Sequence, residues 1–277
     1  MSIDHYENFP VASWLCPKPL RPVIISLYRF ARVGDDLADE GHAHAASRRA
    51  DLCAYAEDLR RVYDREPVSS RWPEVFHPLA SAVHTHKLPQ ALLQDLLDAF
   101  LQDVDNPTYV DRVALLDYCR RSANPVGRLL LHLYGAATEL NLQESDAICT
   151  ALQLINFWQD LSVDLPRGRV YLPQHDLQKF GISGPQGSSL KDGAEMRALV
   201  RDLCVWARGF MEQGAALPWR LPGRVGWELK LVVQGGLRVL DKIEAMNFAT
   251  CSCRPVLGPW DLGITLWRSV TRPPILN

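Results

Sequence analysis

The chain has 277 residues, 47% of them hydrophobic, and a formal net charge of −2 at pH 7. A chain of this length and composition can bury a large core, and a single helical domain fits as well as two small ones; we favour a single domain over residues 1–277. The basic residues are spread along the chain and give no sign of a nucleic-acid partner. The chain has no long uncharged apolar stretch and does not open with a basic segment followed by an apolar one. We therefore expect a cytoplasmic protein without a membrane span.

Apolar periodicity between Pro, Gly and Asn signals predicts helices along most of the chain, whereas strand signals are nearly absent. The expected helices cover residues 19–35, 43–65, 74–86, 89–103, 111–139, 143–164, 191–217, 222–248 and 258–270. One long irregular stretch, residues 166–189, interrupts them, and such a stretch in a compact domain is typical of a functional loop or a linker. The pattern predicts an all-α fold.

The cysteines give no sign of a disulfide framework. There are seven, an odd number, and they are scattered along a chain without an export signal. Cys251 and Cys253 have the wrong spacing for a zinc site. We expect most of the cysteines to be buried thiols.

Two acidic motifs, each with two aspartates four residues apart, are the main chemical signal. Asp35 and Asp39 form the first pair, and Asp160 and Asp164 form the second. Residues i and i+4 share a face of a helix, so each pair offers two carboxylates side by side. Carboxylate oxygens suit Mg²⁺, which commonly bridges protein carboxylates and substrate phosphates. An acidic run on a helix is more often a solvated face, so each motif must be read with its surroundings.

Both motifs extend into polar stripes on apolar helices. Tyr28 and Arg32 precede the first pair at helical spacing, and Gln153 and Asn156 precede the second. The second helix is apolar around most of its circumference, which predicts that it is buried. Buried carboxylates need metals, cations or water as partners. Arg167, Arg169 and Tyr171 follow the second motif, where they can fold over a bound diphosphate.

In order and spacing these residues resemble the squalene/phytoene synthase family, over about residues 5–250. The resemblance rests on Phe9, Ser13, residues 28–39 (YRFARVGDDLAD), 118–127 (YCRRSANPVG), 153–164 (QLINFWQDLSVD) and 167–173 (RGRVYLP). It implies an all-α isoprenoid-synthase helical bundle, in which the two acidic helices face each other across a central cavity and bind diphosphate through Mg²⁺. Family members join two prenyl diphosphates head to head through a cyclopropylcarbinyl diphosphate, or process that intermediate further.

The resemblance also implies roles for individual residues. The implied catalytic residues are Asp35, Asp39, Asp160, Asp164, Tyr118 and Tyr171. The implied metal ligands are Asp35, Asp39, Asn156, Asp160 and Asp164. The implied substrate-binding residues are Phe9, Ser13, Tyr28, Arg32, Gln153, Asn156 and Arg169. Phe9, Phe157, Trp158 and the leucine-rich segment 126–134 are candidates for an apolar wall around a carbocation, with ordinary core packing as the alternative.

Two departures from the common family pattern point to one branch of it. Gln159 stands where many condensing members carry an arginine before the first aspartate of the second motif, and Gly236 stands near a position that is often aromatic. With the opening residues 6–13, they resemble the members that convert presqualene diphosphate and water to hydroxysqualene and diphosphate without NADPH. On this hypothesis one cationic ligand is lost at Gln159, and space near Gly236 admits a water molecule. Tight helix packing is the alternative at Gly236.

Three alternatives stay open. The first is a synthase that itself condenses two farnesyl or other prenyl diphosphates. The second is a non-catalytic helical assembly factor, and the third is a lipid-binding module at a membrane surface. Retention of all four aspartates argues against the assembly factor. An enzyme that supplies presqualene diphosphate is an expected partner. Release of a long hydrocarbon predicts transient membrane contact, for which residues 260–267 are a candidate and terminal-helix packing the alternative.

Overall fold

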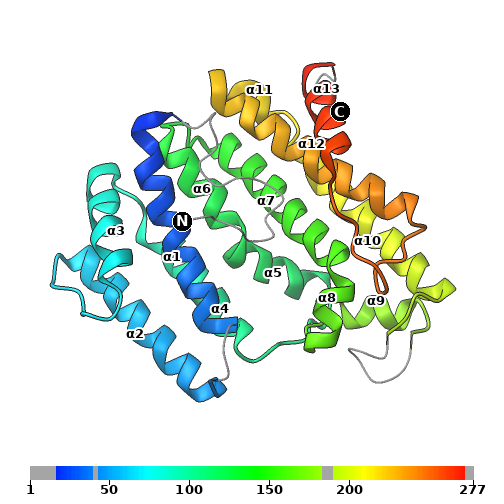
Figure 1. The fold of residues 1–277 in the computed structure, drawn as a ribbon, viewed down its shortest axis with the longest axis horizontal. Helices are drawn as coiled ribbons and strands as arrows, with labels where there is room; N and C mark the ends of the chain where they lie inside the picture. The colour runs from blue at the N-terminus through cyan, green and yellow to red at the C-terminus, as the bar shows by residue number, and fades with distance from the viewer. Residues whose placement is uncertain (1–16, 40–42, 183–189, 272–277) are drawn as a thin grey trace.

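The structure, a computed structural model, describes residues 17–39, 43–182 and 190–271, and every regular element in these ranges is a helix (Figure 1). The predicted all-α class is confirmed. The first elements are η1 (Lys18–Leu20), α1 (Arg21–Asp39), α2 (Ala45–Asp64), α3 (Pro73–His86), α4 (Gln90–Asp103), α5 (Arg112–Ser122), α6 (Asn124–Leu133) and α7 (Glu139–Gln159). The remaining elements are α8 (Leu161–Asp164), η2 (Leu165–Arg167), α9 (Gln174–Lys179), α10 (Ala194–Gln213), α11 (Leu217–Arg220), α12 (Gly223–Ala245) and α13 (Pro259–Thr271).

The prediction of one continuous helix over residues 111–139 is wrong, because the chain forms two helices, α5 and α6, with a break at Ala123. Pro125 lies in the first turn of α6, and a proline has no amide hydrogen with which to continue the preceding helix. α5 begins where Asp111 accepts a hydrogen bond from the amide of Ala114 at 2.9 Å. Because of the break, α5 and α6 can follow different directions while both pack on α4 and α7.

The helix predicted over residues 143–164 also has a break, at the second acidic motif. α7 ends at Gln159, Asp160 has φ −100° and ψ 13°, and α8 starts at Leu161. The amide of Asp164 still donates to the carbonyl of Asp160 at 2.9 Å. One turn therefore still separates the two aspartates, which stay on the same side of the chain.

Two other predicted boundaries need correction. The predicted helix over residues 191–217 is α10 followed by the separate turn α11, whose first turn contains Pro218. The predicted irregular stretch 166–189 contains the end of η2 and all of α9. Residues 183–189 lie outside the described ranges.

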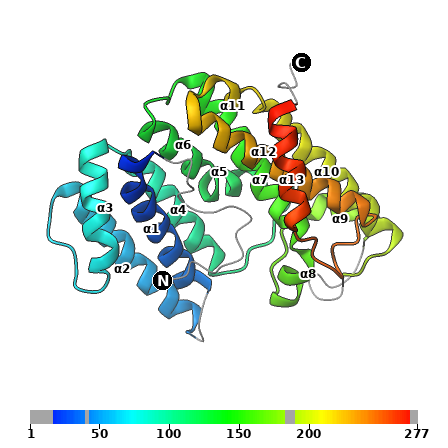
Figure 2. The ribbon, with the colours of Figure 1, turned by 45° about the horizontal axis from the view of Figure 1, so that its top comes forward.

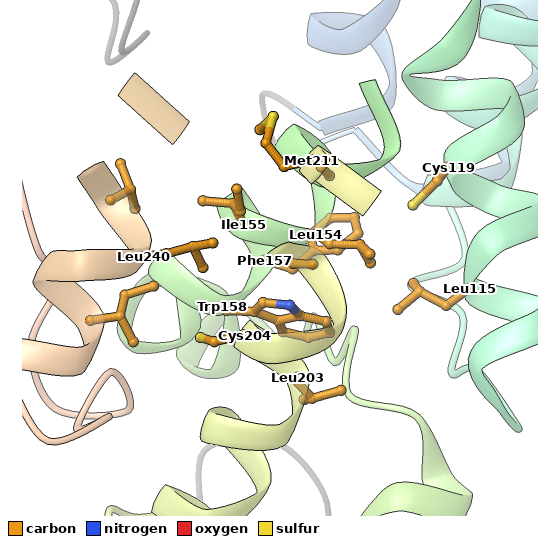
Figure 3. Packing of buried hydrophobic residues seen from close by; sticks show 14 of the residues in the cluster. Leu115, Cys119, Leu154, Ile155, Phe157, Trp158, Leu203, Cys204, Met211 and Leu240 are labelled. Carbon is orange, nitrogen blue, oxygen red and sulfur yellow. The ribbon is translucent and has the colours of Figure 1, made fainter. Parts of the chain in front are cut away.

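The apolar side chains gather in two clusters. One belongs mainly to α1–α4, where the ring of Phe30 lies 5.3 Å from that of Tyr55 and 6.1 Å from that of Phe76. The other surrounds α7, where Trp158 packs among side chains of α10 and α12 (Figure 3). Figures 1 and 2 show α1–α4 on one side of the molecule, α10, α12 and α13 on the other, and α5–α7 between them. The two acidic motifs therefore come from different clusters.

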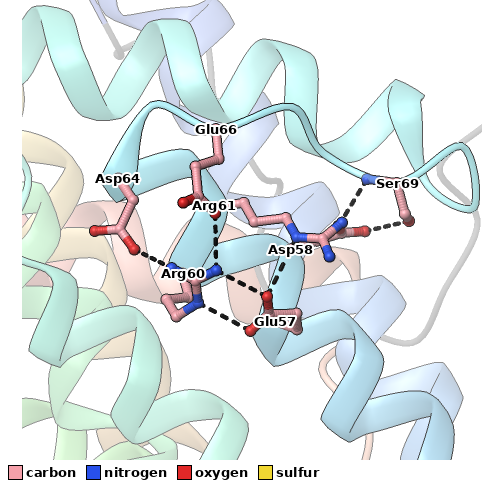
Figure 4. Close-up of polar contacts among 7 residues, drawn as sticks. All are labelled: Glu57, Asp58, Arg60, Arg61, Asp64, Glu66 and Ser69. Atoms are coloured by element: carbon pink, nitrogen blue, oxygen red, sulfur yellow. Dashed lines mark hydrogen bonds and ion pairs between the residues drawn. The ribbon is translucent and has the colours of Figure 1, made fainter.

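The connection from α2 to α3 is held to α2 by charged side chains (Figure 4). The guanidinium of Arg60 lies 2.9 Å from a carboxylate oxygen of Glu57 and 2.8 Å from one of Glu66. Buried Asp58 accepts hydrogen bonds from the amide of Ser69 at 2.8 Å and from its hydroxyl at 2.5 Å. These bonds satisfy a carboxylate that would otherwise be costly to bury.

Six cysteines lie in the described ranges and all are free. Cys119 and Cys204 are buried, but Cys53 and Cys253 are exposed, so the prediction that most are buried is wrong for this part of the chain. Along the same residues, no helix combines the length and the apolar character needed to cross a bilayer.

Candidate active site

The first acidic motif lies at the C-terminal end of α1, which continues through Asp39 instead of ending near residue 35. Asp35 and Asp39 are one turn apart on this helix, as their spacing predicts. Arg32 precedes them and contacts carboxylates of its own helix, with Nη1 3.3 Å from Asp35 and Nη2 2.7 Å from Asp36. The polar stripe predicted on this helix is therefore present, and Arg32 is the cation within it.

Arg169 joins the two acidic motifs. Its Nη2 lies 2.6 Å from Oδ2 of Asp39, and the two side chains are only 21% and 22% exposed. The backbone amide of Arg169 donates to the carbonyl of Asp164 at 3.0 Å. One residue thus contacts the first motif through its side chain and the second through its backbone, which brings both motifs to one site.

Arg254 supplies a cation to the second motif. Its Nη2 lies 3.4 Å from Oδ2 of Asp160, and its Nε donates to Oδ1 of the same carboxylate. Both side chains are mostly buried. Sequence reasoning missed Arg254 because it lies 94 positions beyond its partner, outside any recognisable motif.

Gln159 holds the segment that carries Arg254. Its side chain is fully buried, and Nε2 donates to the carbonyl of Pro255 at 2.7 Å. The contact shows what Gln159 does in this chain instead of supplying a cation. The amide anchors the neighbouring backbone, and the cation beside Asp160 comes from Arg254.

Burial and neighbouring negative charges raise the pKa values of two of the aspartates. Burial, and then the neighbouring charge of Asp39, raises the pKa of Asp35 to about 6. Burial, and then the charge of Asp160, raises the pKa of Asp164 to about 6, and Asp39 adds to this effect from the opposite motif. The charge of Arg169 opposes both shifts. The site therefore concentrates negative charge that a bound cation would relieve.

Asp103, at the end of α4, is a site residue that sequence reasoning missed. Its Oδ2 accepts a hydrogen bond from the hydroxyl of Tyr118 at 2.8 Å. Burial raises the pKa of Asp103 to about 7, the bond from Tyr118 lowers it, and the charges of Asp39 and Asp35 raise it. These couplings place Asp103 beside the first motif. No sequence signal marks it, because its partner lies on the next helix.

Aromatic side chains form one side of the site. The rings of Phe157 and Tyr171 are stacked with centroids 3.9 Å apart, and Tyr118 lies 6.0 Å from Tyr171. Burial raises the pKa of Tyr118 well above its ordinary value, so its phenol stays protonated at neutral pH. The structure thus brings both predicted tyrosines together with Phe157. Trp158 has an edge-on contact with Phe157, at 6.2 Å between ring centroids, and packs in the core beside Leu203 and Cys204 (Figure 3).

The other predicted residues follow the two helices. Half-buried Tyr28 lies one turn before Arg32 on α1. Half-buried Gln153 and exposed Asn156 precede Asp160 on α7. The structure therefore keeps both polar stripes. Phe9 and Ser13 lie outside the described residues.

Gly236 lies where α12 packs on α7. A Cβ atom at this position would lie 2.9 Å from Cδ2 of Leu152, 3.0 Å from Cε of Met211 and 3.4 Å from Cδ1 of Ile155. These contacts fill the space beside the glycine. They favour the helix-packing interpretation of Gly236 over space for a water molecule.

The donor set fits Mg²⁺. Within the described ranges no three His, Cys, Asp or Glu side chains are placed to enclose a metal with protein ligands alone. Magnesium usually takes one or two carboxylates and completes its shell with water and phosphate oxygens. The site offers two pairs of carboxylates, whose oxygen atoms are hard donors. The raised pKa values of Asp35 and Asp164 reflect burial and uncompensated negative charge, and a bound Mg²⁺ would neutralise that charge.

Chemically, the site combines acids, arginines and rings. Arg32, Arg169 and Arg254 each pair with an aspartate of a motif, so they lie where an anion bridging the motifs would bind. The stacked rings of Phe157 and Tyr171 offer π faces that stabilise a nearby cation. Such a site can hold a departing diphosphate on one side and a carbocation on the other.

Comparison with known proteins identifies the family of the chain. The model of the squalene/phytoene synthase family matches residues 4–268. A hydroxysqualene synthase of Sinorhizobium fredii is 32% identical over 242 residues, which are 87% of this chain and 79% of that protein. A hydroxysqualene synthase of Zymomonas mobilis is 39% identical over 180 residues, which are 64% of this chain and 58% of that protein.

A solved structure is similar along nearly its full length. The crystal structure of squalene synthase HpnC from Alicyclobacillus acidocaldarius has 35% sequence identity and a TM-score of 0.79, covering 88% of this chain and 90% of that one. The described helices thus have the terpenoid-synthase arrangement that the sequence predicts. The chain belongs to the squalene/phytoene synthase family.

Proposed function

We propose that this chain is a Mg²⁺-dependent hydroxysqualene synthase, which converts presqualene diphosphate and water to hydroxysqualene and diphosphate. The observation that carries the proposal is the meeting of the two aspartate pairs at Arg169, which contacts Asp39 and Asp164 together. The likeness to hydroxysqualene synthases supports the choice of substrate. On this proposal the whole chain works as one domain.

The residues divide the work of ionisation. Asp35, Asp39, Asp160 and Asp164, with the amide oxygen of Asn156, would hold Mg²⁺. When bound, Mg²⁺ acts as a Lewis acid that stabilises the charge on the leaving diphosphate. Arg32, Arg169 and Arg254 donate charge-assisted hydrogen bonds to the diphosphate oxygens. Tyr28 and Gln153 complete the polar side of the site, and Phe9 and Ser13 are proposed to bind substrate.

The aromatic side of the site protects and then quenches the cation. Phe157 and Tyr171 shield it, since a carbocation must meet only the intended nucleophile. Capture by water forms a carbon–oxygen bond and releases one proton. The hydrogen-bonded pair of Tyr118 and Asp103 is suited to orient that water and accept the proton, because the pKa of Asp103 lies at about 7. No hydride is transferred, so NADPH is not expected.

The proposal has consequences for partners and location. Presqualene diphosphate must come from an enzyme that condenses two farnesyl diphosphates, which makes that enzyme a partner in substrate transfer. We propose a cytoplasmic protein that touches the membrane surface when it exchanges its apolar substrate and product. No role for nucleic acid is proposed.

The first experiment supplies purified protein with Mg²⁺ and, separately, presqualene diphosphate or farnesyl diphosphate, without NADPH. Mass spectrometry should detect hydroxysqualene from presqualene diphosphate and no product from farnesyl diphosphate. The Asp39→Asn and Asp164→Asn variants should lose turnover, whereas Asp105→Asn, in an exposed ion pair with Arg49, should keep it. Absence of turnover with both substrates would revive the assembly-factor interpretation.

One observation favours a second candidate, condensation of two prenyl diphosphates. Arg254 restores a cation beside the second motif, so loss of the arginine at position 159 does not by itself exclude that reaction. Presqualene diphosphate, squalene or phytoene formed from prenyl diphosphates in the same assay would establish this alternative.

A further inference from the structure

Helix α13 has its polar side toward the protein and its apolar side toward solvent. The buried positions Asp261, Thr265 and Ser269 recur once per turn along one face. The exposed apolar side chains are Trp260, Leu262, Leu266, Trp267 and Val270. Trp260 is 89% exposed and Trp267 is 65% exposed. A surface helix of a globular protein normally has the opposite arrangement, and no other described part of the chain covers this outer face.

The polar face of α13 is fully used inside the molecule. The hydroxyls of Thr265 and Ser269 donate to carbonyls one turn earlier at 2.8 and 2.7 Å. Asp261 accepts bonds of 2.7 Å from both Arg238 and Lys242 on α12. These contacts fix α13 on α12 at the edge of the molecule (Figure 1). The direction in which the tryptophans point is therefore set by the ion pairs of buried Asp261.

We propose that the outer face of α13, defined by its five exposed apolar side chains, docks on the interface of a lipid bilayer that contains anionic headgroups. Tryptophan is enriched at membrane interfaces because its ring is apolar and its N–H is polar. At 13 residues the helix is shorter than the roughly 20 needed to span a bilayer. It therefore lies in the plane of the interface, as monotopic amphipathic helices do.

The joint beneath α13 carries the charge that complements such headgroups. It consists of Arg208, Arg238, Asp241, Lys242, Asp261 and Arg268. Arg208 and Arg268 share the single carboxylate of Asp241, as Arg238 and Lys242 share that of Asp261. Four cations thus oppose two carboxylates. Anionic lipids attract basic groups that lie close to the surface, so the excess positive charge of this joint favours a bilayer with anionic headgroups.

A second copy of the chain fits this face less well. A helix of 13 residues is about 20 Å long and about 10 Å wide, so two copies packed face to face would bury on the order of 400 Å². A stable protein interface usually buries about 1,200–2,000 Å². A bilayer has no such requirement, because each apolar side chain that enters it contributes separately.

Docking gives the enzyme access to its apolar reactants. In this respect the inference rests on the proposed function, because a thirty-carbon alcohol and its precursor partition into membranes. The docking surface itself is defined by α13 alone, so binding and turnover can be measured separately.

The test is sedimentation of the full-length protein with sucrose-loaded vesicles of phosphatidylcholine, with and without one quarter phosphatidylglycerol. Wild-type protein should partition onto the anionic vesicles, and Trp260→Ser/Trp267→Ser should reduce the partition coefficient at least tenfold. Val113→Ser/Val205→Ser is the matched control, since both valines are exposed but lie on α5 and α10. That control should bind like wild type.

Circular dichroism melting and turnover of detergent-dispersed presqualene diphosphate accompany the binding measurements. Unchanged melting and turnover in the tryptophan variant, with lost vesicle binding, would support the inference. Equal binding of the wild type and the tryptophan variant would overturn it. A wild-type dimer that becomes a monomer in the tryptophan variant, measured by light scattering, would assign the face to a second copy instead. If the wild-type protein binds vesicles but does not turn over presqualene diphosphate, the result would count against the proposed reaction and not against membrane docking.

Discussion

At the scale of single residues, opposite charges from distant parts of the chain hold the site together. Asp39 pairs with Arg169 and Asp160 pairs with Arg254, and all four side chains are mostly buried. Removing one member of such a pair leaves the other uncompensated in a poorly solvated place, which costs more than the pair contributes. Substitutions at these positions therefore report on both binding and local structure.

Arg254 and Gln159 should act as one unit. Arg254→Gln removes charge-assisted hydrogen bonds of about 1.5–3 kcal/mol each, so kcat/KM should fall by about ten- to a hundredfold. Gln159→Leu breaks the bond to Pro255 and should lower kcat/KM less. Because Gln159 acts through Arg254, the double variant should be little worse than Arg254→Gln alone.

Steady-state kinetics on the four proteins measures this coupling. Arg220→Gln serves as the control, since Arg220 forms a peripheral ion pair with Glu144 and should leave kcat/KM unchanged. Fully additive effects of the two site substitutions would show that Gln159 does not position Arg254.

The acidic residues also predict how the protein responds to pH. Asp35 and Asp164 have a pKa of about 6 in the folded chain against an ordinary value of 3.8. Between about pH 4 and 6 the folded state therefore binds more protons than the unfolded state, and the stability of the metal-free protein should fall as pH rises. Activity should instead rise through pH 6, because metal binding needs both carboxylates ionised.

Thermal unfolding in EDTA at pH 4.5 and pH 7.5 measures the effect on stability, and initial rates over the same range measure the effect on activity. Asp35→Asn/Asp164→Asn should flatten the stability profile. An unaltered profile in that variant would mean that other groups control the pH response.

At the scale of helices, the sequence predicts the fold class well and the breaks poorly. Periodicity identifies the helices because each buries one face, but a break such as the one at Asp160 depends on tertiary contacts. The i, i+4 spacing of the aspartates was enough to predict two carboxylate pairs. Asp103 and Arg254 were missed because their partners are separated from them by 15 and 94 positions. A single sequence does not show such pairings.

The packing of α12 on α7 yields a prediction at Gly236. Gly236→Phe forces a ring into space already filled by Leu152 and Met211, which should cost about 1–3 kcal/mol of unfolding free energy. Gly209→Phe is the control, because a Cβ atom there meets no atom within 4 Å. Urea denaturation should show a loss for the first variant and little change for the second. Equal stability of both would indicate open space beside Gly236.

At the scale of the whole molecule, the site lies between two hydrophobic clusters. α1 carries the first aspartate pair and belongs to one cluster, and α7 leads to the second pair and belongs to the other. A ligand that bridges the aspartate pairs therefore links two parts of the core. Binding to the folded state alone must stabilise that state.

Mg²⁺ with inorganic pyrophosphate should accordingly raise the melting temperature. At a ligand concentration a hundred times its Kd, the stabilisation should be about 2.7 kcal/mol. Differential scanning calorimetry measures it without any turnover. Asp39→Asn/Asp164→Asn should abolish the shift, and Asp105→Asn should retain it. A shift that persists in the doubly substituted protein would place the pyrophosphate elsewhere.

The order of synthesis gives the contact between Arg254 and Asp160 a further consequence. The cluster of α1–α4 is built mainly from residues 23–104, so it can collapse while later residues are still being made. The second cluster needs residues up to about 257. Arg254 is the last of the charged site residues to be added during synthesis. The nascent chain can therefore form its first cluster long before its diphosphate site is complete, and a chain that ends before Arg254 lacks the full arginine set with which to capture substrate.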